Sequence, residues 1–276
     1  MILIADAGGT KTDWRLLDGE KVTALSSNGF NPNTHDLDKY MTSVMPMFTD
    51  VKMQVQKIYF YGASLYPTST DFIKEMNRHF PEAQVNVNND LFGSCRALSA
   101  DQPGFVGIMG TGSAGCFYDG EKVAIHPPSL GYALGDEGSG AVLGKTLLRQ
   151  IFRNRLSQEI VNLFQSTYSL RKEELYAEVY RGNHPNMYLA SFTRFLKDQI
   201  HFPEIKELVF DGFDQYFEAF FSEMPGLNDH SFHFTGSVAF HFSDVLKEVA
   251  DKRSLRFGNI LKSPIEGLVT YHQQHG

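Results

Sequence analysis

Two turns in this sequence combine glycine with hydroxyl side chains directly after an apolar stretch. They consist of Gly8, Gly9, Thr10 and Lys11 in the first case, and of Gly110, Thr111, Gly112 and Ser113 in the second. Glycine has no Cβ, so the backbone of such a turn can reverse tightly and approach a ligand closely. Successive N–H groups then form a concave anion site, to which a hydroxyl adds a donor. We therefore predict that both turns bind phosphate groups.

Two carboxylates are placed to do chemistry beside these turns. Asp6 ends the apolar stretch before the first turn, where a carboxylate can bind a metal ion, directly or through water, next to phosphates. Asp90 follows Asn89 at the start of a predicted helix. A carboxylate within hydrogen-bonding reach of a hydroxyl can act as a general base. Aspartate is also a common helix N-cap, so a purely structural role for Asp90 stays open at this point.

The spacing of apolar residues predicts the elements that position these groups. A strand hairpin and a third strand occupy residues 1–25, and the same strand–turn–strand–turn–strand order begins again near residue 104. The remaining strands are predicted at 57–62, 84–88, 232–234 and 255–257. Helices are predicted at 36–49, 69–79, 89–100, 137–155, 157–166, 172–181, 188–200, 205–224 and 238–250, with a closing helix from Pro264. The duplication predicts two α/β domains of the same design.

Two glycine patterns are decoys. Gly110–Gly115 matches the G-x-G-x-x-G dinucleotide pattern, but a strand follows it where the dinucleotide fingerprint requires a helix. Gly144–Thr146 resembles the end of a P-loop, but the required upstream glycine is Ser139, and an apolar helical repeat surrounds the segment. The ten histidines do not pair with cysteine or carboxylate at zinc-ligand spacing, so no structural metal site is predicted.

Composition narrows the classes of partner. The 276 residues carry a net charge of −7 with a pI near 5.8, which argues against nucleic-acid or anionic-membrane surfaces. Only two cysteines are present, so no disulfide framework is implied. The sequence shows neither a secretory signal nor a run of about 18 apolar residues that could span a membrane. We expect a cytoplasmic protein.

Four motifs together resemble a known family. They are the first hairpin, Asn89-Asp90, the second hairpin, and Phe234-Thr-Gly-Ser-Val238 between a strand and a helix. Paired phosphate-binding hairpins on duplicated domains resemble the actin-like ATPase fold of sugar kinases and heat-shock chaperones. The segment Leu130–Gly140, with the sequence LGYALGDEGSG, resembles the N-acetylglucosamine kinase branch of the BadF/BadG/BcrA/BcrD ATPases. The resemblance runs along the whole chain and ends at Ser263–Gly267.

This resemblance implies a fold and an activity. It implies two actin-like (ribonuclease H-like) domains with a nucleotide cleft between them. Residues 1–100, joined by the closing helix 265–276, would form the first domain, and residues 101–264 the second. It further implies a kinase that transfers the γ-phosphate of Mg-ATP to the 6-hydroxyl of N-acetylglucosamine or a related amino sugar, with ATP and Mg²⁺ as cofactors and a homodimer as the assembly.

The resemblance also implies a role for each motif. Asp90 would be the general base and Asp6 would bind Mg²⁺. Both hairpins would bind ATP phosphates, and Gly236 and Ser237 would contact the nucleotide. Residues implied to contact the sugar are Asp136, Ser64 and an asparagine of the loop after residue 28, either Asn31, which we favour, or Asn33. Glu137 either contacts the sugar or only favours the dipole of the following helix, the role to which we lean.

Two rival functions exist on the same fold. A redox-activator ATPase carries an iron–sulfur cluster between two subunits, and Cys95 and Cys116 could supply two thiolates per subunit. Their helical and apolar-strand contexts instead favour small buried hydrophobes, and the C-G-G-Q-D-like element of such activators is missing. A sugar-sensing regulator would need a DNA-binding module, which the acidity of the chain disfavours.

Overall fold

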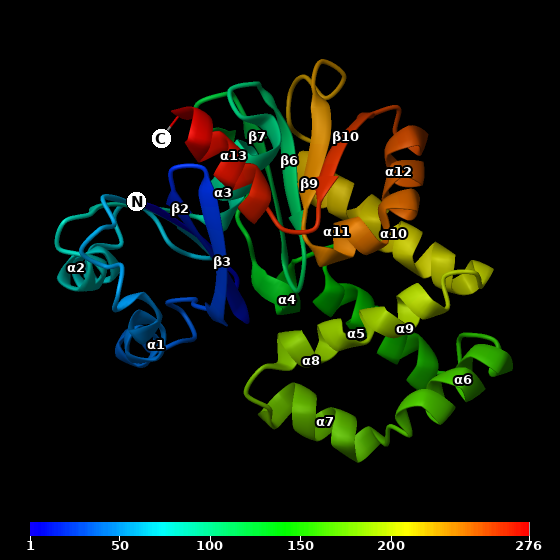
Figure 1. Cartoon of the computed structure of the whole chain (residues 1–276). Coiled ribbons are helices and arrows are strands. Elements are labelled where there is room, and N and C mark those ends of the chain that lie inside the picture. The colour runs from blue at the N-terminus through cyan, green and yellow to red at the C-terminus, as the bar shows by residue number, and fades with distance from the viewer. Residues whose placement is uncertain (276) are drawn as a thin grey trace. The chain divides into compact units, whose positions relative to one another are not determined.

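The computed structural model describes residues 1–275 and divides the chain into two compact units. Unit 1 consists of Met1–Gln102 together with the closing segment from Ser263, and unit 2 consists of Pro103–Lys262. Each unit is built on one five-stranded mixed sheet with helices packed on it (Figure 1). Within residues 1–275, no helix is long and apolar enough to cross a membrane.

The two sheets have the same topology. In unit 1 the strand order is β3-β2-β1-β4-β5, and in unit 2 it is β8-β7-β6-β9-β10. In both, the first three strands form an antiparallel meander and the last two add in parallel beside the first. The strands are β1 (Ile2–Ala7), β2 (Lys11–Asp18), β3 (Lys21–Asn28), β4 (Lys57–Gly62), β5 (Gln84–Asn88), β6 (Gly104–Met109), β7 (Ser113–Tyr118), β8 (Val123–Ile125), β9 (Ser231–Thr235) and β10 (Arg256–Leu261). The expected α/β class and the duplicated strand motif are confirmed.

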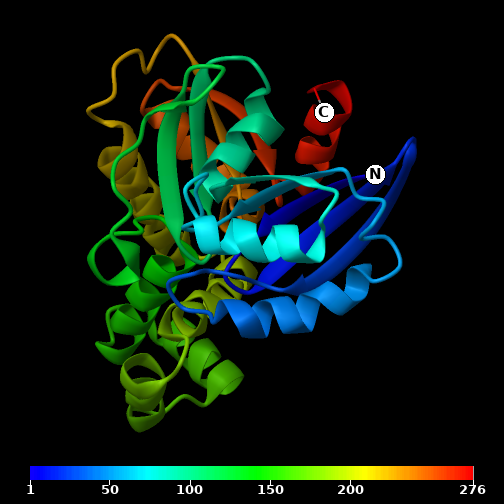
Figure 2. The ribbon, with the colours of Figure 1, turned by 90° about the vertical axis from the view of Figure 1, so that its left-hand side faces the viewer.

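Helices cover both faces of the unit 1 sheet (Figure 2). These helices are α1 (Leu37–Val44), the 3₁₀ helix η1 (Met45–Phe48), α2 (Thr70–His79), α3 (Asp90–Ser99) and α13 (Ile265–His275). One face packs against α1, η1 and α2 through a core that contains Trp14, Phe48 and Phe60. The other packs against α13 through residues such as Ile4 and Leu268. Side chains alternate between faces along a strand, so Asp6, two residues after Ile4, points to the face of α3 and α13.

One continuous core fills unit 2. Its helices are α4 (Gly131–Leu134), α5 (Gly140–Phe152), α6 (Gln158–Tyr168), α7 (Lys172–Arg181), α8 (Pro185–Ser191), α9 (Thr193–Asp198), α10 (Pro203–Phe221), α11 (Ser237–His241) and α12 (Ser243–Lys252). Aromatic side chains of α10 lie across β6 and β7 where Gly107 and Gly115 face each other: Tyr216 contacts Gly107, and Phe220 and Phe221 contact Gly115. A Cβ on Gly107 would clash with the Tyr216 hydroxyl, which donates to Ala114 O at 2.7 Å.

Several predicted boundaries were wrong for physical reasons. The helix expected at 36–49 changes to 3₁₀ geometry at Met45, where Pro46 lacks the N–H needed to continue an α-helix. The helix expected at 188–200 breaks at Phe192, and the helix expected at 238–250 breaks at Phe242. Both of these phenylalanines are buried in the core of unit 2. The third strand extends to Asn28, because β3 pairs with β2 as far as Lys11.

Candidate functional site

The first hairpin turn is a tight, exposed connection between β1 and β2. Gly8 N donates to Lys11 O at 2.9 Å, and residues 8–11 are all exposed. A Cβ on Gly9 would meet no atom within 4 Å, and neither Gly8 nor Gly9 has a positive φ. The turn itself would therefore accept alanine at position 9. The open space beside this glycine suits a group that comes from outside the chain, such as a phosphate.

Gly29 supports this turn from behind, and the sequence analysis did not single it out. A Cβ there would clash with the Gly8 carbonyl oxygen and lie 2.5 Å from the amides of Thr10 and Lys11. The next residue, Phe30, donates its N–H to Gly8 O at 3.1 Å. The turn-rich composition of the segment after β3 was the available signal, but it predicted only a loop.

Asp6 lies at the end of β1 in an acidic, partly buried environment. It is directly opposite Asp13 on β2, and Asp13 forms an ion pair with Lys11 at 2.7 Å. Ser263, just before α13, donates its hydroxyl to Asp6 Oδ2 at 3.1 Å. Burial raises the pKa of the Asp6 carboxyl to about 7, the Ser263 hydrogen bond opposes this rise, and the charges of Asp90 and Asp13 add to it. A carboxyl in this state binds a cation readily, because a positive charge restores its ionised form.

Asp90 is the first residue of α3, and Asn89 is its N-cap. Asn89 Oδ1 accepts from Phe92 N at 2.7 Å, whereas Asp90 Oδ1 accepts from the adjacent Leu91 N at 2.9 Å. The capping role that was left open for Asp90 therefore belongs to its neighbour. The charges of Asp90 and Asp6 interact, so the structure brings the predicted base and the predicted metal ligand together in unit 1.

The three predicted sugar-side residues of unit 1 are linked by hydrogen bonds. Asn31 Oδ1 accepts from Asn33 N at 2.9 Å, and Asn33 Nδ2 donates to Ser64 Oγ at 3.1 Å. Ser64 follows β4 and has a φ of 60°, a strained conformation for a residue other than glycine. Such strain is often found at functional sites. The polar side chains of the loop after β3 and the loop after β4 thus form one hydrogen-bonded cluster.

The second hairpin turn, between β6 and β7, is joined to the segment before α5. Gly110 again leaves open space where a Cβ would be, without a positive φ. Ser113 Oγ donates to Glu137 O at 2.8 Å. Asp136 is buried, with 9% of its surface exposed, and a backbone hydrogen bond links it to Ser113. Burial raises the pKa of the Asp136 carboxyl, and this hydrogen bond opposes the rise.

Gly236 and Ser237 lie between β9 and α11. Gly236 has a φ of 110°, and a Cβ there would clash with the Met109 carbonyl oxygen and lie 3.2 Å from Gly110 N. Glycine is thus required for packing against the start of the second hairpin. Ser237 is exposed at the first position of α11, which has only five residues. Because α11 is so short, only a small helix dipole is expected at this position.

A polar network below α3 was missed by the sequence analysis. Arg96 Nη1 donates to Tyr61 Oη at 2.7 Å, and Tyr61 Oη lies 2.9 Å from His272 Nε2. Tyr59 stacks on His272 with ring centroids 3.7 Å apart. Burial lowers the pKa of His272 to about 3, and the charge of Arg96 adds to the effect. The network connects β4, α3 and α13, and no local motif in the sequence announces it.

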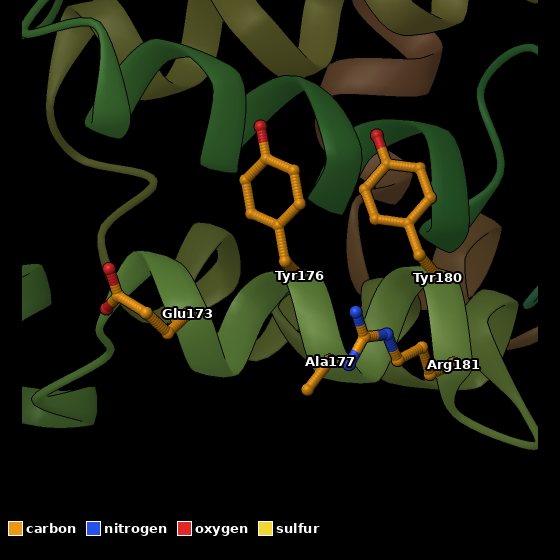
Figure 3. A pocket seen from close by; sticks show the side chains of 5 residues that line it. All are labelled: Glu173, Tyr176, Ala177, Tyr180 and Arg181. Atoms are coloured by element: carbon orange, nitrogen blue, oxygen red, sulfur yellow. The ribbon is translucent and has the colours of Figure 1, made fainter.

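A surface hollow of about 400 Å³ lies away from all predicted site residues. It is lined by α7 alone, through Glu173, Tyr176, Ala177, Tyr180 and Arg181, and the two tyrosine rings point to the same side of the helix (Figure 3).

Among residues 1–275, no group of three His, Cys, Asp or Glu side chains could bind a metal ion together. Cys95 and Cys116 are both fully buried, as expected for small hydrophobes.

Comparisons with known proteins give the chain its relatives. No protein-family profile matches the chain. A candidate N-acetylglucosamine kinase from Porphyromonas gingivalis is 34% identical, with a TM-score of 0.94 and 99% of each chain covered. A ROK family glucokinase from Streptomyces griseus, solved with glucose and AMPPNP, has a TM-score of 0.56 at 13% identity, with 100% of this chain and 99% of that chain covered, which shows the fold alone. The curated glucosamine kinase GspK of Vibrio cholerae serotype O1 is 33% identical over 76 residues, so the matched stretch spans only 26% of that relative and 28% of this chain.

The duplicated five-stranded units, each with a glycine-and-hydroxyl hairpin after its first strand, define the actin-like ATPase fold of the sugar kinases. Within that class, similarity over nearly the full length of both chains shows that this protein belongs to the N-acetylglucosamine kinase-like family. The family and fold expected from the sequence motifs are both confirmed.

Proposed function

We propose that this protein is an amino-sugar kinase that transfers the γ-phosphate of Mg-ATP to the 6-hydroxyl of N-acetylglucosamine or a close relative. The observation that carries the proposal is the pair of hairpin turns at equivalent positions of the two units. Both leave space beside a glycine that the turn itself does not require. The names of the relatives, an N-acetylglucosamine kinase and a glucosamine kinase, support the amino sugar.

Nucleotide binding is assigned to both hairpins and to Gly236 and Ser237. Gly8 N and Gly110 N donate to Lys11 O and Gly112 O within the turns. The other amides of the two turns would bind ATP phosphates, as backbone nests do elsewhere. The solved complex of the ROK glucokinase with AMPPNP supports ATP as the donor. We further propose a cytoplasmic homodimer that does not bind nucleic acid, and a place among the BadF/BadG/BcrA/BcrD ATPases.

The residues present fit a Mg²⁺ ion beside Asp6. Mg²⁺ in phosphoryl-transfer sites is usually bound by one or two carboxylates, with waters and substrate phosphates as its other ligands. A single buried carboxyl with a pKa of about 7 meets this need without a cluster of protein ligands. When bound, the ion would supply positive charge next to the phosphates of ATP.

Asp90 would act as the general base. In the proposed reaction its carboxylate accepts the proton of the sugar hydroxyl while that oxygen attacks the γ-phosphorus, and ADP leaves. Asn89 caps α3, so the N-cap position is filled by a residue other than Asp90. The acceptor would be positioned by Asn31, Ser64 and Asp136, with Asn33 linking the first two.

No observation favours the activator function. Its cluster would need thiolates that reach the protein surface, and the exposed fraction of Cys95 and of Cys116 is 0%. A buried thiol packs as a small hydrophobe and is a poor cluster ligand.

Product analysis tests the proposal. N-acetylglucosamine and Mg-ATP are incubated with the enzyme, and the products are examined by ³¹P and ¹³C NMR. We expect a phosphomonoester whose coupling places the phosphate on C6. A product phosphorylated at C1 would contradict the assigned hydroxyl, and the appearance of inorganic phosphate without any sugar phosphate would contradict the kinase.

A further inference from the structure

In unit 2, the segment Leu130–Gly140 and the hairpin turn between β6 and β7 are joined by hydrogen bonds. Gly140 N donates to Gly110 O at 2.8 Å, and Ala141 N donates to Thr111 O at 3.1 Å. The first two amides of α5 therefore donate hydrogen bonds to the backbone of the turn. The segment before α5 adds side-chain contacts to these backbone bonds.

Asp136 is the centre of these contacts. A backbone hydrogen bond from Ser113 reaches its carboxylate, and a Cβ on Gly112 would lie only 3.1 Å from its Oδ2. Its φ of 56° lies in the left-handed region, which strains a residue that carries a Cβ. Its neighbour Glu137 accepts the Ser113 hydroxyl through its backbone oxygen. Asp136 is thus a strained residue whose buried carboxylate contacts the backbone of the turn, and these features fit a residue that supports the turn.

We propose that Asp136 is a positioning residue for the second phosphate hairpin, so that nucleotide binding depends on it even when no sugar is present. The inference rests on the proposed function, because it assigns the nucleotide phosphates to this turn. The Asp136 carboxylate orients the Ser113 amide and fills the space beside Gly112. It thereby fixes the backbone whose remaining amides face the phosphates.

The same carboxylate then joins two binding events. In the proposed function Asp136 also contacts the sugar hydroxyls, so sugar and nucleotide share one side chain as a common support.

Two substitutions separate this role from a simple sugar contact. Asp136→Asn keeps an oxygen that can accept from the Ser113 amide, and asparagine tolerates the positive φ. Asp136→Gly also suits this φ but removes the acceptor. The readout is the Kd of Mg-AMPPNP measured by calorimetry in the absence of sugar. If Asp136 contacted only the sugar, its substitution would not change this Kd.

We expect Asp136→Gly to weaken Mg-AMPPNP binding roughly tenfold, the size of a lost hydrogen bond to a charged group, while Asp136→Asn stays within a factor of about three of wild type. Wild-type affinity in Asp136→Gly would overturn the inference, and equal losses in both variants would overturn the hydrogen-bond role in favour of the charge. Failure of the wild-type protein to bind Mg-AMPPNP would instead overturn the proposed function.

Hydrogen exchange keeps the inference testable if Asp136→Gly does not fold. In the wild-type protein without ligands, the Ser113 amide should exchange far more slowly than the amide of Gly9, which lies in the exposed first hairpin turn. Exchange of the Ser113 amide as fast as that of Gly9 would contradict its bond to Asp136.

Discussion

Asp6 combines burial, the charges of two nearby aspartates, Asp13 and Asp90, and a hydroxyl donor, Ser263. An isolated carboxylate at the end of a strand would be ionised and hydrated. Here burial and the charges of Asp90 and Asp13 favour the protonated form, and only Ser263 and Lys11 oppose them. This environment leaves Asp6 in need of a cation, which is the physical argument for its role at the metal.

Replacing Asp6 should therefore stabilise the ligand-free protein while it abolishes turnover. The folded pKa of about 7 lies above the ordinary aspartate value of 3.8, so the folded state holds the proton more tightly, and stability falls as pH rises from about 4 to 7. In Asp6→Asn this loss is absent. We expect this variant to exceed wild type by a few kcal/mol at pH 8, since one pKa unit corresponds to about 1.4 kcal/mol.

Urea unfolding in magnesium-free buffer at pH 8 and at pH 4 measures this difference. The advantage of Asp6→Asn should shrink towards pH 4, because the Asp6 carboxyl then becomes protonated in the unfolded state as well as in the folded state. Asp18→Asn, an exposed aspartate at the end of β2, serves as the charge-matched control and should show no comparable gain. A destabilised Asp6→Asn at pH 8 would show that the carboxylate is favourably solvated.

Substitutions of glycines in the hairpin turns should distinguish effects on nucleotide affinity from effects on stability. Gly9→Ala and Gly110→Ala add a methyl group in open space, so both variants should unfold like wild type. If phosphates occupy that space, Mg-AMPPNP affinity should fall by about tenfold, or about 1.4 kcal/mol.

Gly29→Ala is the contrasting variant, because its methyl group would clash with the turn from behind. It should lose stability as well as affinity. Unchanged Mg-AMPPNP binding in both Gly9→Ala and Gly110→Ala would remove the phosphates from the two turns. Thermal unfolding and calorimetry on the three variants give both readouts.

At the scale of elements, α3 is the helix on which the proposed base depends. Gly93 brings it close to β4, since a Cβ would lie 2.9 Å from Tyr61 Cβ, and Gly267 of α13 packs against Ala97 in the same way. Arg96, Tyr61 and His272 add polar contacts between the three elements. The helix is thus fixed on two sides along its length, and Asp90 extends from its first turn.

Tyr61→Phe should weaken this support. Removal of the hydroxyl takes away a hydrogen-bonding group that the half-buried Arg96 and the buried His272 share, a change that costs about 1–3 kcal/mol in comparable cases. Urea unfolding should show this loss, while Tyr59→Phe, which keeps the ring stacked on His272, should stay close to wild type. Equal stability of Tyr61→Phe and wild type would mean that apolar packing alone fixes α3.

The elements that the sequence predicted well are those with a simple period or a clear turn. The strand at 57–62 and the helix at 172–181 match the structure residue for residue. Breaks at Phe192 and Phe242 could not be predicted, because both residues extend the apolar period while their rings turn into the core. Local pattern carries the period of a helix, whereas its interruption is decided by tertiary packing.

Predictability of the candidate site follows the same division. The hairpin turns, Asp6 and Asp90 lie in short local motifs, so the sequence alone predicts them as site residues. Gly29 and Ser263 act across long sequence separations, on Gly8 and Asp6 respectively, so only the folded chain identifies them. The choice between Asn31 and Asn33 stays a prediction in favour of Asn31, with Asn33 as its link to Ser64.

At the scale of the whole molecule, one design is used twice for two different tasks. Both units share a strand order and a hairpin turn after the first strand. Unit 1 adds the carboxylates Asp6 and Asp90, and unit 2 adds Asp136 and Gly236. The repeat in the sequence predicted the duplication because each copy has a glycine-and-hydroxyl turn after its first strand.

The rate of ADP release from Mg-ATP, with and without N-acetylglucosamine, tests the central claim most directly. Wild type should release ADP quickly with the sugar and slowly in the sugar-free blank. Asp90→Asn should lose this sugar-dependent rate while its Kd for Mg-AMPPNP stays near wild type, because the base is needed for transfer and not for nucleotide binding. ADP release that is the same with and without N-acetylglucosamine, glucosamine or N-acetylmannosamine, or an Asp90→Asn variant as fast as wild type, would contradict the account.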